Sequence, residues 1–307
     1  MSLDLSEFEF PPEFDAAALQ RGHAAMKEIV PEMSKVRLVV TSEFEETVRE
    51  YAKAGDDAPA YEQDRGEFGV AMGKVMRLSG DEIAVIIDSS VLLAGQEHGV
   101  PEQTFKHEAY HVALHQRGES LYDERDDDDE AGLAERQYFG MAAIACEESR
   151  VEMPLCRERP SPVYGWFPSL LESVESDVCR LSREYQDSDD GPDDVIAISR
   201  GFSKRFHSMV TACGYVAAVM EARECGLPDI DPRIDRRVFG EYGAEVIDRL
   251  RQLPPADQVA DRADLETAAE DISELLMPWG SDIGFRWEDL LGDQSAFRVL
   301  KPAKWVL

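Results

Sequence analysis

The chain has 307 residues, of which 43% are hydrophobic and 31% are charged, a composition that suits a folded protein of one large or two modest domains. Asp and Glu total 63 against 32 for Lys and Arg, so the formal charge is −31, which disfavours nucleic acid and anionic membranes as partners. The 5 cysteines form no Cys-x-x-Cys pair and no long apolar run occurs, so we expect reduced thiols in an untargeted cytoplasmic protein without a membrane segment.

The amino-terminal part of the sequence alternates between helix and strand signals. Residues 13 to 30 predict a helix that ends before Pro31, residues 35 to 42 predict a strand rich in β-branched side chains, and residues 43 to 54 predict a second helix. Two further strand-like runs, GEFGVAMGKVMRL and EIAVIIDSSVLL, are separated by Ser-Gly-Asp, which is typical of a turn. These two runs therefore predict a hairpin.

From residue 130 onward the sequence is mostly helical in pattern. Strands followed by helices predict an α+β fold with a small amino-terminal sheet and a mostly helical carboxyl-terminal part. The stretches 154 to 168 and 187 to 194 are rich in Pro, Gly or charge, so we expect linkers or long turns there. Helices are expected near residues 130 to 153, 167 to 186, 193 to 223, 234 to 252 and 263 to 276.

The stretch TFKHEAYHVALHQ, residues 104 to 116, holds the pattern His-Glu-x-x-His at His107, Glu108 and His111. Positions four apart on a helix lie about 40° apart around the axis and about 6 Å apart along it, so both imidazoles can bind one ion. Glu108 lies about 100° round from His107, where it can hold a metal-bound water without being a ligand. These are the parts of a zinc hydrolase, on a helix expected to begin near Pro101 and to end at Gly118.

A third protein ligand is expected from a later segment. His115 lies about 12 Å from His107 along the helix, too far to share one zinc ion with both histidines. We therefore interpret His115 either as a group that contacts substrate or as a packed histidine. His207, on the long helix predicted after residue 193, is open to the same two interpretations.

The segment MAAIACEESRVE places acids in the apolar stripe of a predicted helix. At about 100° per residue, Glu148 and Glu152 fall on that stripe, whereas Glu147 and Arg150 fall outside it. A carboxylate among apolar side chains is costly unless it is paired or binds a metal. We therefore predict Glu148 as the third ligand and Glu152 as the acceptor of a ligating histidine's free ring N–H, with Glu147 as the alternative ligand. The competing interpretation is that these acids only form salt bridges, with Arg136, Arg150 or Arg159.

HEAYH at 107 to 111, together with Glu148 and Glu152, resembles the zincin superfamily in its glutamate-ligand branch, the gluzincins. In that branch a helix bearing Glu-x-x-x-Asp follows the His-Glu-x-x-His helix; here a glutamate replaces the aspartate. The resemblance covers roughly residues 83 to 152. We expect a zincin-like metal-binding region at 1 to 153 and a helical region at 154 to 307 that packs on it and completes the cleft. The resemblance also implies that AVIIDSSVLL is the strand beside the cleft, with an exposed edge for an extended peptide.

The predicted function is a zinc-dependent hydrolase, most simply an intracellular metallopeptidase with a peptide or protein substrate. Glu108 would act as the general base. Two alternatives remain open: a metal enzyme that acts on a small molecule, with zinc or iron, and a non-catalytic protein that is stabilised by zinc or binds a regulatory partner. A di-iron bundle would need a second Glu-x-x-His, which the sequence lacks. Donors to a developing oxyanion would come from His115, Tyr122, Tyr138, His207 or Tyr215.

Overall fold

The structure is a computed structural model that describes residues 14–54, 72–93, 99–121, 132–158, 176–177, 180–181, 183, 192–230, 240–290 and 295–300. The chain forms two compact units, Met1–Gly118 and Glu119–Leu307. The expected α+β class is confirmed, because a three-stranded sheet lies in the first unit and helices dominate the second. The sequence predicts a division at 153/154, a position that helix α4 (Leu133–Glu158) crosses without a break.

The sheet of the first unit has the strand order β1-β3-β2, with β1 at Val36–Thr41, β2 at Gly73–Arg77 and β3 at Ile83–Asp88. The predicted hairpin is confirmed, since β2 and β3 pair antiparallel across a turn at Ser79–Asp81 in which Gly80 has φ 76°. β1 pairs parallel to the other side of β3. The expectation that AVIIDSSVLL offers an exposed edge is therefore wrong: β3 is the central strand, and both of its edges are paired.

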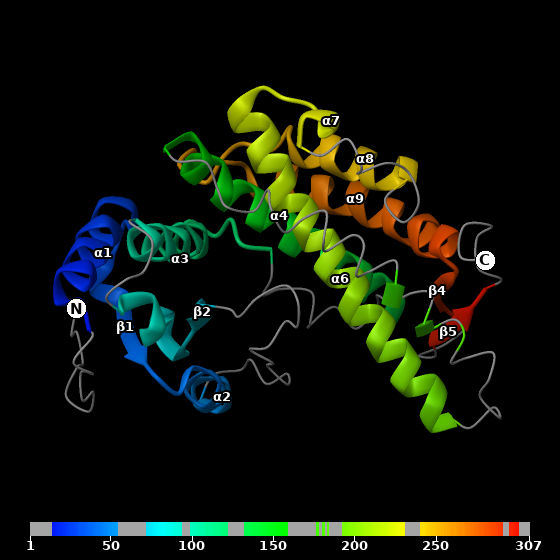
Figure 1. Ribbon diagram of the computed structural model, residues 1–307, viewed down its shortest axis with the longest axis horizontal. Coiled ribbons are helices and arrows are strands. Elements are labelled where there is room, and N and C mark those ends of the chain that lie inside the picture. Colours follow the sequence, from blue (N-terminus) through cyan, green and yellow to red (C-terminus); the bar gives the residue numbers. More distant parts are fainter. Residues whose placement is uncertain are drawn as a thin grey trace. The chain divides into compact units, whose positions relative to one another are not determined.

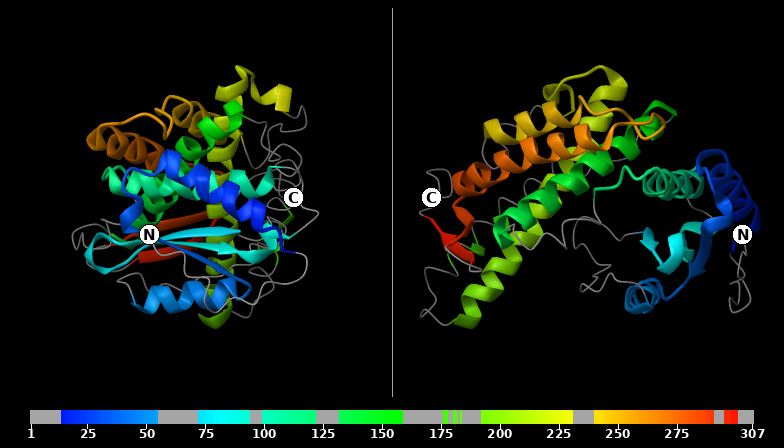
Figure 2. Two further views of the ribbon diagram at one scale, coloured as in Figure 1. Left: turned by 90° about the vertical axis from the view of Figure 1, so that its left-hand side faces the viewer. Right: turned by 180° about the vertical axis from the view of Figure 1, so that it is seen from behind.

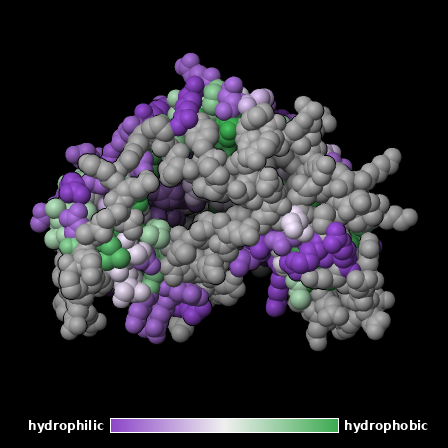
Figure 3. Space-filling model, viewed as in Figure 1, coloured by the Kyte–Doolittle hydropathy of each residue, from purple (hydrophilic) through white to green (hydrophobic). Residues whose placement is uncertain are grey.

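Three helices cover the two faces of this sheet (Figures 1 and 2). α1 (Ala16–Ile29) and α3 (Val100–Gln116) lie on one face, and α2 (Phe44–Ala54) lies on the other. Successive side chains of a strand point to opposite faces, so Ile87 of β3 packs with α1 and α3 while Ile86 packs with α2. The outer face of α2 is hydrophilic (Figure 3). The strand and helices predicted for residues 13 to 54 are thus confirmed.

The second unit is built from long helices that pack side by side: α4, α6 (Pro192–Arg223), α8 (Gly240–Leu250) and α9 (Arg262–Ile283), with the short α7 (Leu227–Ile230) after α6. Figure 1 and the rear view of Figure 2 show this arrangement. The helices predicted near 130 to 153, 193 to 223, 234 to 252 and 263 to 276 are confirmed in their described parts. The helix predicted at 167 to 186 lies mostly outside the described residues.

A two-stranded hairpin of β4 (Phe285–Asp289) and β5 (Ser295–Val299), which the sequence reading did not anticipate, follows α9. Gly284, with φ 115°, ends α9 and turns the chain into β4. One face of the hairpin joins a cluster of aromatic rings. Its members are Phe202, Phe206, Trp279, Phe285, Trp287 and Phe297.

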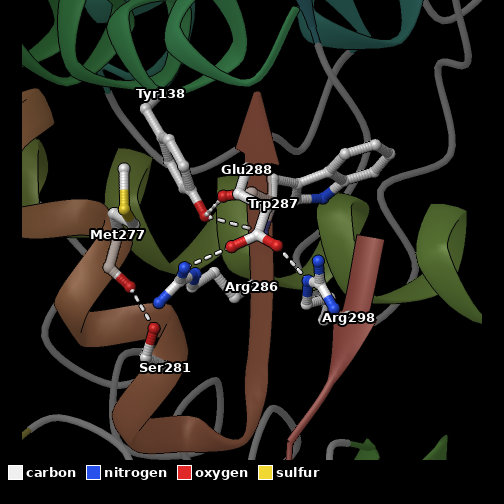
Figure 4. Close-up of polar contacts among 7 residues, drawn as sticks. All are labelled: Tyr138, Met277, Ser281, Arg286, Trp287, Glu288 and Arg298. Carbon is white, nitrogen blue, oxygen red and sulfur yellow. Dashed lines mark hydrogen bonds and ion pairs between the residues drawn. The ribbon is translucent and has the colours of Figure 1, made fainter. Parts of the chain in front are cut away.

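The polar side chains of this hairpin connect to each other and to α4 (Figure 4). Glu288 forms ion pairs with Arg286 and Arg298, whose hydrogen bonds lower the pKa of its carboxyl group. Asp289 accepts hydrogen bonds from the backbone N–H groups of Ala134 and Glu135, and so caps the amino terminus of α4. No helix within the described ranges has the length and apolar character needed to cross a membrane.

Candidate metal centre

Helix α3 presents His107, Glu108 and His111 from a fixed position on the sheet. Phe105, Ala109 and Val112 on its inner face belong to the core shared with β1, β3 and α1. Phe105 also lies under Gly22 of α1, where a Cβ would meet its ring at 2.6 Å, so only glycine allows this close helix packing. The helix begins with Pro101 in its first turn, and Gly118, with φ 70°, follows its end.

His107 and His111 lie side by side on this helix, as their spacing predicts. Their Nε2 atoms are 3.1 Å apart, their ring centroids are 4.8 Å apart, and the rings meet at 67°. Two nitrogens that each lie about 2.0 to 2.1 Å from a tetrahedral zinc ion are about 3.3 Å apart. The pair therefore has the separation that a shared ion needs, and the same distance also allows one ring to donate a hydrogen bond to the other.

Glu108, between the two histidines in sequence, is 5% exposed and packs against the edge strand β2. A Cβ placed on Gly73 of β2 would lie 2.3 Å from Glu108 Oε1 and 2.6 Å from its Cδ, so the strand reaches the carboxylate only because residue 73 is glycine. Gly73 was not singled out from the sequence. Its signal was a glycine inside an otherwise regular strand pattern, which often marks a close approach of the backbone.

The sequence predicts that β3 has the exposed edge beside the His-Glu-x-x-His helix, but in the structure β2 has that edge. It pairs with β3 on one side and with no other described strand, and it contacts α3 at Glu108. The strand edge next to the His-Glu-x-x-His helix is therefore that of β2. An edge strand presents backbone N–H and C=O groups with which an extended peptide can pair.

The acids predicted as further ligands lie on α4 in the second unit. Glu147 Oε2 accepts a hydrogen bond of 2.8 Å from the hydroxyl of the buried Ser120. Glu152 Oε2 accepts one from Cys156 Sγ at 4.0 Å. Glu148 is half-buried with a buried Oε2, and its Cβ lies beside Gly214 of α6. Ser120 thus holds the Glu147 carboxylate, and the choice between Glu148 and Glu147 as the third ligand stays a prediction.

Arg150, on the same helix, forms a buried ion pair with Glu119 rather than with any of these three acids. The distance between Arg150 Nη2 and Glu119 Oε2 is 2.5 Å, and both side chains are 2% exposed. Arg150 Nε also donates to the carbonyl of Pro254, which fastens the segment between α8 and α9 to α4. The salt-bridge interpretation of the acids on α4 therefore does not apply through Arg150; Arg159 lies outside the described residues.

The remaining candidate side chains have different surroundings. Tyr138 is buried and hydrogen-bonded to the backbone of Trp287, whose N–H lies 3.1 Å from the Tyr138 hydroxyl oxygen, and burial raises the pKa of this phenol (Figure 4). Its hydroxyl is thus part of the α4–β4 packing. His115 lies in the last turn of α3, and His207 lies half-buried on α6 beside the buried Phe206. Tyr122 lies outside the described residues.

None of the described cysteines forms a disulfide. Cys146, Cys156, Cys213 and Cys225 are free thiols, as the sequence predicts, and the first three are buried. Comparison of the chain with protein-family models, with curated proteins and with solved structures found no match in any of the three searches.

Proposed function

We propose that the protein is a zinc-dependent hydrolase that cleaves a peptide or amide bond, with zinc bound by His107, His111 and Glu148. Each of these side chains offers one ligand atom, an imidazole nitrogen or a carboxylate oxygen. Two histidines and a glutamate form a known ligand set of catalytic zinc, which leaves one position for water. The observation that carries the proposal is the 3.1 Å separation of the two Nε2 atoms on one face of α3.

Bound at these three residues, zinc would supply a Lewis acid that polarises a carbonyl and lowers the pKa of water. Glu108 is next to His107 in sequence, and its carboxylate lies in close contact with Gly73 of β2, which limits its movement. As general base, Glu108 would take a proton from the attacking water and would deliver it to the leaving nitrogen. Burial of the carboxylate keeps bulk water away from this proton transfer.

The edge of β2 gives the proposal a substrate class. An extended peptide that adds to this edge would run past Glu108, because Gly73 of β2 contacts the Glu108 side chain. Such pairing uses only backbone groups, so it tolerates many side chains. The substrate that fits best is therefore an extended segment of a peptide or protein.

The test combines zinc analysis with substitutions that separate metal binding from chemistry. We expect about one zinc per chain in the purified protein, retained in Glu108→Gln but lost in Glu148→Ala. Glu147→Ala is the matched control and should retain zinc. With a fluorogenic peptide library as substrate, Glu108→Gln should lose at least about 100-fold in rate. Full activity of Glu108→Gln, or zinc loss in Glu147→Ala alone, would overturn the assignment.

A further inference from the structure

Thr211, in the middle of α6, carries a buried hydroxyl that makes no hydrogen bond to any described residue. The residue is 8% exposed. Hydroxyls inside helices usually donate to the carbonyl four residues earlier. Thr104 donates in this way to Val100, and Thr267 donates to Ala263. Thr211 makes no such local bond, so its hydroxyl is buried without a hydrogen bond from the part of the chain that the structure describes.

Such a group in a folded protein calls for a reason, because a valine of the same shape would avoid the cost of burying it. The rest of this part of α6 is apolar: Met209, Val210, Ala212 and Cys213 are all buried. A polar side chain at position 211 is therefore an exception in the sequence of the helix. The packing of α6 against helix α4 near this residue suggests a role for the hydroxyl.

Helices α4 and α6 run parallel to each other and lie side by side in Figures 1 and 2. Gly214 of α6 lies against α4, where a Cβ would be 2.6 Å from the carbonyl oxygen of Ala145 and 3.3 Å from Glu148 Cβ. Further along both helices, Met153 packs in one cluster with Ala218. These contacts follow in the same order along α4 and along α6, so the two helices run in the same direction.

This direction brings the Glu148 side chain toward the level of Thr211. Side chains on a helix lean toward its amino terminus, so the Glu148 carboxylate reaches back by about one turn from its own Cα. Thr211 lies about one turn before Gly214, which is itself level with Glu148. Thr211 and the carboxylate end of Glu148 therefore lie at about the same level along the two helices, and each carries a buried oxygen atom.

We infer that Thr211 is a positioning residue for Glu148: its hydroxyl donates a hydrogen bond to the Glu148 carboxylate when that carboxylate binds the metal ion. The inference rests on the proposed function. A ligating carboxylate is oriented by hydrogen bonds from residues behind it, and loss of such a partner weakens metal binding. Rotation about χ1 moves the hydroxyl of Thr211 among three staggered positions, which gives it more than one direction in which to donate.

The test measures zinc affinity by competition with a chromophoric chelator, and thermal unfolding of the zinc-free protein. Thr211→Val should weaken zinc binding about 10- to 100-fold, while the midpoint of unfolding of the zinc-free protein stays equal or rises. Thr211→Ser, which keeps the hydroxyl, should restore the affinity. Thr267→Val is the matched control, since it removes a hydroxyl bonded to Ala263 and should lower only the unfolding midpoint.

The background of Glu148→Ala separates the two proposals. There, Thr211→Val should have no further effect on any residual zinc binding, because the hydroxyl acts through Glu148. Wild-type zinc affinity in Thr211→Val would overturn the inference and leave the proposed function intact. A marked fall in the unfolding midpoint of zinc-free Thr211→Val would also overturn it, because the hydroxyl would then be structural. Absence of zinc binding by the wild-type protein would overturn both.

Discussion

Replacement of Gly73 by alanine tests the contact between β2 and Glu108. The added Cβ would lie 2.3 Å from Oε1, 2.6 Å from Cδ and 2.7 Å from Cγ of Glu108, whereas ordinary van der Waals contacts begin near 3.4 Å. The carboxylate must therefore retreat by about 1 Å, or β2 must shift by as much. Glu108 is 5% exposed and has little room to move. Overpacking of this kind costs about 1 to 3 kcal/mol.

Two assays separate the consequences of Gly73→Ala. Urea unfolding should show a free energy of unfolding lowered by about 1 to 3 kcal/mol. Peptide hydrolysis should fall by about 100-fold, because a base displaced by about 1 Å no longer lines up with the attacking water. Zinc content should stay unchanged, since His107 and His111 lie on another face of α3.

A double-mutant cycle decides whether the cost arises at Glu108. In the background of Glu108→Ala the obstructing atoms are absent, so Gly73→Ala should cost little stability or none. The expected coupling energy is therefore about 1 to 3 kcal/mol. An equal loss of stability in both backgrounds would refute the reasoning, because the strain would then come from the strand and not from the contact with Glu108.

Three further predictions concern the second unit. Glu119→Ala leaves the 2%-exposed Arg150 guanidinium without its carboxylate and should lower the free energy of unfolding by about 3 to 5 kcal/mol in urea, where a loss below about 1 kcal/mol would mean that the pair is solvated. Gly214→Ala should destabilise the protein by about 1 to 3 kcal/mol, because the added Cβ would meet α4. Gly140→Ala should stabilise the protein by up to about 1 kcal/mol, because its Cβ meets no described atom within 4 Å. Changes of the same sign in the two variants would contradict the packing of α4 and α6. Burial raises the pKa of the Cys146 thiol to about 12, so near pH 8 it stays protonated and should react with a disulfide reagent only upon unfolding; rapid reaction in the folded protein would disprove its burial.

Local signals in the sequence were enough to place most elements of the first unit. Pro101 and Gly118 bracket α3, and observed helix ends at Val100 and Gln116 agree with them to within two residues. The Ser-Gly-Asp turn gave the β2–β3 hairpin in the same way, because Gly80 accepts a positive φ. These signals depend on neighbours in the chain and need no knowledge of tertiary contacts.

Features that depend on distant residues were not predictable in this way. The parallel pairing of β1 with β3 makes β3 central and transfers the exposed edge to β2, and no residue within either strand reports that partner. The contact of Gly73 with Glu108 joins positions from a strand and a later helix. The β4 segment Phe-Arg-Trp-Glu-Asp alternates aromatic and charged residues, which is typical of a strand. This short pattern was not recognised because it follows a long series of predicted helices.

In the candidate site, too, features set by neighbours in the chain were predictable, and features set by distant residues were not. The spacing of His107 and His111 predicts their pairing, because both lie on one helix. For the acids on α4 the helical stripe predicts Glu148 rather than Glu147 as the ligand, while the hydrogen bond from Ser120 to Glu147 comes from outside the helix and has no signal within it. The partner of Arg150, Glu119, depends on the tertiary fold and was not anticipated.

The binding of one zinc ion by His107, His111 and Glu148 is tested most directly by X-ray absorption spectroscopy of the zinc-loaded protein. We predict a first shell of nitrogen and oxygen only, at about 2.0 to 2.2 Å, with outer scattering from two imidazole rings. His111→Ala should reduce that scattering to one ring. Sulfur neighbours at about 2.3 Å, or a spectrum that His111→Ala leaves unchanged, would contradict this assignment of the metal centre.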